Sequence, residues 1–358
     1  MNKLIAVILL FFVASLQAQV ARKYSNEFLN IGVDAAAFGM SNAVVASSSD
    51  VNSGYWNPAG LLNLKGKQIS LMHANYFANI ANYDYAAFAM PIDEKSAFSL
   101  SLIRFGVDDI LDTTKLIDAD GNINYNNINL FSAADYAFTF SYARNLGIEN
   151  LRFGANAKII RRIIGDFANS WGFGFDVGLQ YDYKKWTFGL MARDITTTFN
   201  TWDIDQEKLE DIQNAIPGEN QEAPEETEIT LPKLQLGIAR TFTFKHKLTL
   251  LTELDFDIRF TETNDLIASS FASITPSLGL QLDYNNLVFL RSGVGNFQNV
   301  TQLEGGEKLN VQPNLGLGFH YKGIYVDYSL TNIGKTDEVF YSNIFSLKLD
   351  WSIFQKKQ

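Results

Sequence analysis

The 358-residue sequence predicts an all-β fold: a 14-stranded antiparallel transmembrane β-barrel with an N-terminal hatch plugging the lumen. Three observations favour this fold. Apolar and polar residues alternate over stretches of about a dozen residues, which is longer than most strands of soluble proteins. The number of such stretches is even, as in bacterial single-chain barrels. The connections between these stretches alternate between short and long, as the periplasmic turns and external loops of outer-membrane barrels do.

The alternating stretches begin at Gln68 and fill the rest of the chain. Residues 171–182 are the clearest case, with aromatic and aliphatic side chains on one face and mainly glycine, glutamine and aspartate on the other. Glu253 and Asp255 also share one face of a stretch, and they need a polar lumen because they cannot face lipid. The predicted strands are 68–76, 83–92, 95–107, 133–145, 149–161, 169–183, 185–199, 232–242, 246–261, 272–284, 286–297, 309–322, 323–334 and 340–354.

The first residues predict a secretory signal peptide over 1–18, in which Lys3 precedes an apolar run that ends at Ala14. That run is short for a membrane span. The predicted domain organisation is therefore a signal peptide, a hatch, a barrel and a tail, placed in the cell outer membrane among its lipids. Their bounds are 1–18, 19–65, 66–354 and 355–358.

The composition excludes several classes of protein. There is no cysteine, so no disulfide framework is expected, and no basic stripe that would suit nucleic acid. The three histidines, His73, His246 and His320, lack the spacing of metal ligands, and neither a Gly-x-Ser-x-Gly elbow nor a phosphate-binding loop is present. We therefore expect a non-enzyme with no catalytic residues, no metal site and no cofactor.

The predicted loop over 200–231 concentrates acidic residues against Lys208 alone, in a chain whose net charge is −10. A solvated external loop is the favoured interpretation. The alternative is a gate or a docking surface for a basic partner, with a short amphipathic helix over 205–216. The acidic residues are Asp203, Asp205, Glu207, Glu210, Asp211, Glu219, Glu222, Glu225, Glu226 and Glu228.

A second loop holds oxygen-bearing side chains around Gly121, over residues 118–124. Such spacing is typical of calcium loops, but the glutamate that closes an EF-hand is missing. A turn built on Asp120-Gly121 is the favoured interpretation, and calcium is the alternative.

The expected hatch contains a compact motif, Trp56-Asn57-Pro58-Ala59-Gly60, which follows a run of small residues over 34–50. An Asn-Pro step starts a turn because proline fixes its own φ and keeps the preceding residue out of the α region. Small and apolar residues suit a plug, because a barrel of about fourteen strands has a lumen that side chains alone do not fill.

Together, the signal, the small-residue run, the Asn57-Pro58-Ala59-Gly60 motif and the strand number resemble the FadL-like outer-membrane barrels, and most closely their PorV/PorQ branch of type IX secretion. The resemblance implies a hatch with this motif in the lumen and a protein-binding subunit of an export or assembly machine. Its partners would be secretion-system or other outer-membrane complex proteins. The alternative is a FadL-type transporter, whose ligand would be a hydrophobic small molecule. A structural role in some other outer-membrane complex is the third interpretation.

Overall fold

The computed structural model describes residues 25–76, 80–117, 121–208, 210, 227–301, 306–332 and 341–351. The expected signal peptide, the C-terminal tail and most of the acidic loop lie outside the described residues. Within the described part, no helix has the length and hydropathy that crossing a membrane would require.

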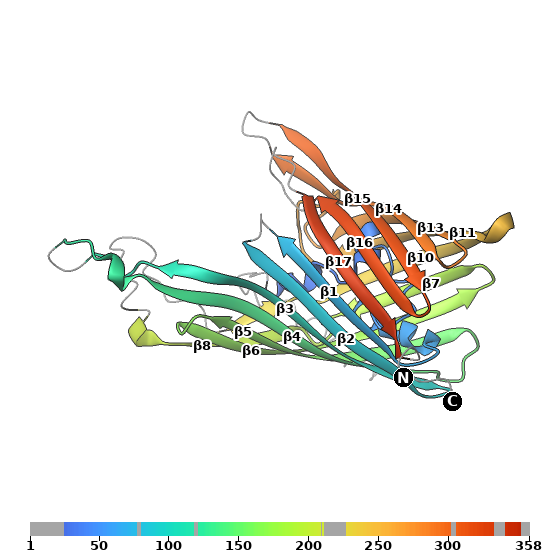
Figure 1. The fold of residues 1–358 in the computed structure, drawn as a ribbon, viewed down its shortest axis with the longest axis horizontal. Helices are drawn as coiled ribbons and strands as arrows, with labels where there is room; N and C mark the ends of the chain where they lie inside the picture. Colours follow the sequence, from blue (N-terminus) through green and yellow to red (C-terminus); the bar gives the residue numbers. More distant parts are fainter. Residues whose placement is uncertain are drawn as a thin grey trace, which may run out of the picture.

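The strands form one antiparallel sheet that closes on itself, because the last strand pairs with the first (Figure 1). Of seventeen strand segments, fourteen form the ring, and β8, β9 and β12 lengthen hairpins beyond it, so the predicted 14-stranded barrel is confirmed. The ring consists of β1 (Gln68–Tyr76), β2 (Ala81–Asp93), β3 (Ser96–Asp112), β4 (Asn129–Arg144), β5 (Leu151–Ile164), β6 (Ala168–Tyr183), β7 (Trp186–Arg193), β10 (Lys233–Thr243), β11 (Leu248–Arg259), β13 (Ser273–Tyr284), β14 (Val288–Thr301), β15 (Glu307–Tyr321), β16 (Ile324–Asn332) and β17 (Tyr341–Asp350).

The outward faces of these strands carry the large apolar side chains that alternation predicted. Phe173 is 59% exposed and Leu317 is 57% exposed, whereas inward-facing Asp176 and Glu253 are buried. Inward residues are polar, small or in contact with the N-terminal segment. The wall therefore presents an apolar exterior around a polar interior, as an outer-membrane barrel does.

Two strand hairpins extend farther than the sequence predicted. β3 runs to Asp112 and β4 starts at Asn129, so the loop between them is shorter than the predicted 108–132 (Figure 1). β8 (Thr198–Ile204) and β9 (Thr227–Thr230) lie partly within the predicted loop 200–231 and pair with each other. The position of β8 has a physical cause. Residues 168–173 of β6 extend past the part of β6 that pairs with β7, and β8 supplies the hydrogen-bond partners that their backbone groups need.

The two ends of the barrel differ. At one end, which we call the turn end, tight turns join neighbouring strands, for example β15 to β16 at Lys322-Gly323. At the other, the loop end, lie the connections between β3 and β4, between β8 and β9, and between β14 and β15. In Figure 1 the loop-end termini of β3 and β4 lie at the left, and those of β14 and β15 lie at the top.

The loop end is expected to face outside the cell. Protease added to intact cells should then cut within 211–226, between β8 and β9, while the turn end stays protected. The cut is read by mass spectrometry of the released fragments. Cutting that occurs only after the outer membrane has been permeabilised would contradict this orientation.

The described N-terminal segment, residues 25–64, folds into four short helices joined by turns. These are η1 (Glu27–Asn30), α2 (Ala35–Gly39), α3 (Ser53–Trp56) and η2 (Pro58–Asn63). Side-chain hydrogen bonds tie the segment to β5, β7, β11, β15 and β17, which lie all around the ring. A segment that bonds to every side of a closed ring lies within it, and most of its apolar residues are buried there. Two further single turns, η3 (Tyr125–Asn127) and η4 (Lys245–Lys247), lie in connections.

Candidate functional site

The Asn57-Pro58 turn is the most tightly held part of the N-terminal segment. Asn57 is fully buried, and its side-chain oxygen accepts a hydrogen bond from the Ala59 backbone N–H at 3.2 Å, which caps η2. Its side-chain nitrogen donates to the carbonyls of Val45 and Leu179, both at 3.0 Å. Pro58 occupies the first position of η2, where its missing N–H costs nothing. One side chain thus fixes the turn, a neighbouring loop of the segment and strand β6.

The two aromatic residues before this turn hold the segment together internally. Trp56 donates its indole N–H to the Val33 carbonyl at 3.1 Å, and the Tyr55 hydroxyl donates to the Leu29 carbonyl at 2.6 Å. Their rings meet edge to face, with centroids 4.8 Å apart. Both side chains are buried, so they connect the start of the segment to its motif.

The wall also reaches inward to the backbone of the motif. Asn156 of β5 donates to the Gly54 carbonyl at 2.9 Å, and Arg193 of β7 donates to the Tyr55 carbonyl at 2.9 Å. The Arg193 guanidinium lies 4.4 Å from the centre of the Tyr55 ring, a cation–π contact. Ser141 of β4 also donates to the Gly54 carbonyl, at 3.3 Å. Wall side chains therefore satisfy buried carbonyls of this segment.

Glycines in the wall leave room for the segment at three places. A Cβ atom built on Gly178 would lie 2.2 Å from the Asn57 side-chain oxygen, and one on Gly154 would lie 2.4 Å from the Pro58 carbonyl carbon. Gly154 and Gly178 are direct cross-strand partners on β5 and β6. No side chain larger than hydrogen fits there while the turn is in place.

The other two places repeat this arrangement, and each is again a pair of glycines facing each other across neighbouring strands. Gly189 and Gly237 face the Val45-Ala46 backbone, with Cβ positions 2.5 and 2.8 Å from its atoms. Gly279 and Gly293 face Met40, at 2.8 and 2.4 Å. We call the three pairs, Gly154/Gly178, Gly189/Gly237 and Gly279/Gly293, the glycine seats.

Two buried carboxylates on β11 bind the backbone of the segment directly. Glu253 accepts from the Ala46 N–H at 2.6 Å and the Ser47 N–H at 3.3 Å, and Asp255 accepts from the Val45 N–H at 3.0 Å. Each is at most 2% exposed. The two carboxylates therefore supply acceptors for three successive N–H groups that no secondary structure satisfies.

Asp34 anchors the segment to another part of the ring, at strand β17. Its carboxylate accepts hydrogen bonds from the Ser346 hydroxyl of β17 at 2.8 Å and from the Asn52 side chain at 2.9 Å. Burial raises the pKa of Asp34 above its ordinary value, while the nearby Lys348 ammonium opposes that rise. Lys348 itself forms an ion pair with Asp50. Polar contacts thus hold the segment at both β11 and β17.

The wall is interrupted beside the motif, between β7 and β8. Asp194 and Thr197 have φ angles of 52° and 59°, so the chain turns out of the strand conformation there. The buried Lys158 ammonium lies 2.7 Å from Asp194 and 2.7 Å from Asp176. These ion pairs stabilise the turn that follows β7. The interruption explains why one predicted strand, 185–199, is two segments in the structure.

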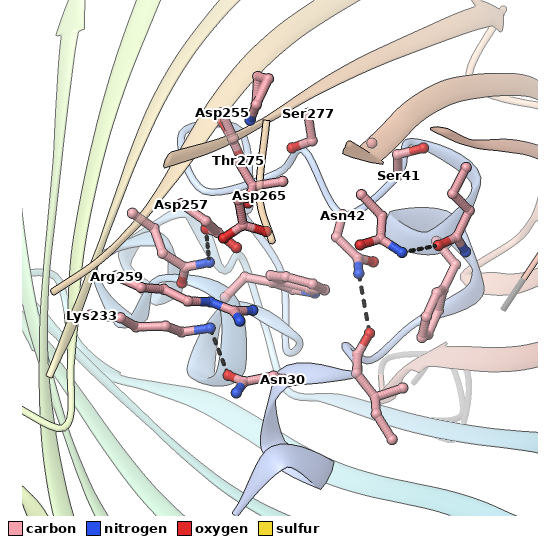
Figure 2. Close-up of a pocket in the computed structure, with 18 of the residues that line it drawn as sticks. Asn30, Ser41, Asn42, Lys233, Asp255, Asp257, Arg259, Asp265, Thr275 and Ser277 are labelled. Carbon is pink, nitrogen blue, oxygen red and sulfur yellow. Dashed lines mark hydrogen bonds between the residues drawn. The ribbon is translucent and has the colours of Figure 1, made fainter. Parts of the chain in front are cut away.

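Two cavities lie on either side of the segment. One, of about 330 Å³, lies at the loop end, between the segment and β10, β11, β13, β14 and β15 (Figure 2). The other, of about 230 Å³, lies at the turn end. Trp56 is the residue that lines both cavities. Charged and amide side chains dominate the loop-end cavity, and several charged side chains line the other.

Two acidic residues of the predicted docking loop belong to strands in the described structure. Glu228 belongs to β9, where it forms an ion pair with Arg162 at 2.9 Å and accepts a hydrogen bond from Ser25 at 2.9 Å. Asp203 belongs to β8 and accepts from Asn169 at 3.3 Å. Both were expected in a solvated loop, and both are instead part of a hairpin because β6 needs a partner strand there.

The rest of that loop is only partly described. Asp205, Glu207 and Glu210 are exposed, and residues 206–208 are helical, within the predicted helix over 205–216. Asp211, Glu219, Glu222, Glu225 and Glu226 lie outside the described residues, as do 118–120 of the calcium alternative. Across the part of the chain that is described, no three acidic or histidine side chains come together as a metal site would need.

Comparisons with known proteins agree on the architecture. A FadL homologue from Pseudomonas aeruginosa is 13% identical with a TM-score of 0.52, over 89% of this chain and 98% of that one. The Pseudomonas putida toluene transporter TodX is 13% identical with a TM-score of 0.55, over the same shares of the two chains. The Ralstonia pickettii toluene transporter TbuX is 11% identical with a TM-score of 0.51, again over 89% and 98%. At these identities the likeness establishes the fold alone.

A search of curated proteins gave no match. The family model described as "Type IX secretion system protein PorV" matches residues 15–213, more than half of the chain. The matched region includes the Asn57-Pro58 turn, the Gly154/Gly178 seat and the interrupted wall. The barrel fold places the chain in the outer membrane, and the chain belongs to the PorV family of type IX secretion system proteins.

Proposed function

We propose that the protein is a non-enzymatic, protein-binding subunit of the type IX export machinery, and that residues 19–65 act as a hatch that closes its lumen. The observation that carries the proposal is the seating of the N-terminal segment, with hydrogen bonds to strands all around the ring and three glycine seats. A lumen filled in this way leaves the loops as the surface for partners.

The barrel needs no cofactor for this role. Two of its buried charged groups have structural contacts: Glu253 binds the N-terminal segment and Lys158 pairs with Asp176 in the wall. A secretion partner, either cargo or another subunit, would bind the loop between β8 and β9. The acidic residues there would steer a basic surface toward the barrel, an effect that weakens as salt rises.

Transport of hydrophobic small molecules is the alternative function, suggested by the resemblance to toluene transporters in fold. Apolar ligands favour pockets lined mainly by apolar side chains. The loop-end cavity instead carries Asp255, Asp257, Asp265, Lys233 and Arg259. This lining favours the protein-binding role over transport of an apolar ligand.

Deleting residues 207–226 tests the proposal and spares the β8–β9 hairpin with its Glu228 contacts. The shortened barrel should assemble normally but retain fewer partners in pull-downs from native membranes, and export should fall. A matched control replaces the same stretch by a neutral Gly/Ser linker of equal length, which separates charge from length. Unchanged export with altered uptake of a long-chain fatty acid would support the transporter function instead.

A further inference from the structure

The loop-end cavity has a lining that is specific enough to identify the chemistry of a ligand. Seven carboxamide side chains and three Ser or Thr hydroxyls surround about 330 Å³, the lower end of the range of small-molecule sites. Four acidic and three basic residues complete the polar wall, so the charges nearly cancel. Phe38, Tyr55 and Trp56 contribute aromatic surface from the N-terminal segment.

Three of these carboxamides have an oxygen that is buried and has no hydrogen-bond partner among the described residues. They belong to Asn42, Gln298 and Asn314. Asn314, which is 6% exposed, donates through its nitrogen to the Ser41 hydroxyl at 2.9 Å, and Asn42 donates to the Ile31 carbonyl at 3.1 Å. In Asn42 and Asn314 the nitrogen is engaged while the oxygen is not, so these side chains have acceptor capacity left over beside the cavity. Unsatisfied buried acceptors are costly, and a ligand that donates to them would relieve that cost.

The basic side chains of the cavity are not arranged for an anion. Lys233 donates to the Asn30 side chain at 2.7 Å, and Arg193 is held by Gln235 and the Tyr55 carbonyl. Figure 2 shows Lys233, Arg259 and Asp257 on one side of the cavity, with Ser41 and Asn42 on the other. An anionic ligand would meet Asp257 on the same side of the cavity as Lys233 and Arg259 (Figure 2), and an apolar ligand would leave the amides unpaired.

We infer that this cavity binds a neutral, polyhydroxylated ligand, such as one or two sugar rings presented at the loop end. Each sugar hydroxyl both donates and accepts, which matches a wall of amides and hydroxyls, and the apolar face of a sugar ring suits the aromatic floor. No residue of the proposed partner-binding loop is among the described residues that line this cavity, so this inference goes beyond the proposed function.

Saturation-transfer NMR on the purified barrel in detergent tests the inference. The probes are glucose, N-acetylglucosamine and maltose, with toluene and a neutral tripeptide as competitors of other classes. At least one sugar should show transfer. Gln298→Leu and Asn314→Leu should each weaken its binding by roughly three- to tenfold, the loss expected for one hydrogen bond. Gln281→Leu, which removes a carboxamide from the turn-end cavity instead, should leave binding unchanged.

Folding of every variant is checked by heat-modifiable migration in gels. Gln298 lies on β14, apart from the Asn314–Ser41 bond, so either variant can report on the site alone if the other fails to fold. The inference would be overturned if saturation transferred to none of the sugars, or to toluene or the tripeptide alone. It would also be overturned if both leucine variants folded and bound the sugar as tightly as the parent.

Discussion

Replacing Gly178 by valine is expected to dislodge the N-terminal segment and make the outer membrane leaky. The added Cβ would lie 2.2 Å from the Asn57 side-chain oxygen and 2.8 Å from Pro58 Cδ, and neither atom can withdraw while the turn stays in its seat. Forcing extra carbons into a packed site costs about 1–3 kcal/mol. Valine suits a strand, so the wall itself should tolerate the change. Entry of a large antibiotic into cells measures the leak.

Gly66→Val is the matched control, because a Cβ at Gly66 meets nothing within 4 Å. Gly154→Val, on the neighbouring strand, should reproduce the leak because it faces the same turn. A Gly178→Val barrel that assembles and remains tight would contradict the assignment of residues 19–65 as the hatch. One that never assembles would mean that the segment belongs to the folding core of the barrel.

Removing both carboxylates that bind residues 45–47 should have the second largest effect. Glu253→Leu with Asp255→Leu leaves three buried N–H groups without acceptors, at about 1–3 kcal/mol each. The amides of residues 45–47 should then exchange with deuterium roughly tenfold to a hundredfold faster. Exchange measured by mass spectrometry on the purified barrel reports this directly.

Glu253→Gln with Asp255→Asn provides the control, because both amides retain an oxygen that can accept from the same N–H groups. This variant also removes two acidic groups that lie together in one buried site. Its exchange should match the parent or be slower. Equally fast exchange in the leucine and amide variants would show that charge, rather than acceptor geometry, holds the segment.

The period-two pattern was sufficient to predict the barrel and its strand number, because the alternation reports directly which face of a strand meets lipid. The pattern could not place β8 and β9. The strand character of residues 200–204 depends on pairing with residues 168–172 of β6, and that of β9 depends on pairing with β8. Neither partner is visible in the local pattern. For the same reason Glu228 was expected in a solvated loop, although it pairs with Arg162.

The residues that receive the N-terminal segment were not found from the sequence. The glycines of residues 171–179 were visible, but a glycine in a strand has several uses, including kinks and bulges. Their role depends on cross-strand register, which brings Gly154 opposite Gly178. Asn57 was singled out for its turn, whereas its bonds to Val45 and Leu179 are tertiary and leave no local trace.

The pairing of β1 with β17 constrains how the chain must fold. Asp34 bonds to Ser346 across more than 300 residues, and the ring cannot close until the last strand has arrived. A segment already inside the ring must therefore be gathered before or during that closure. Bringing such distant residues together requires a large loss of chain entropy before any contact compensates for it, so folding should be slow. Until β17 is added, β1 presents an unpaired edge, and the half-built barrel depends on protection from association with other strands.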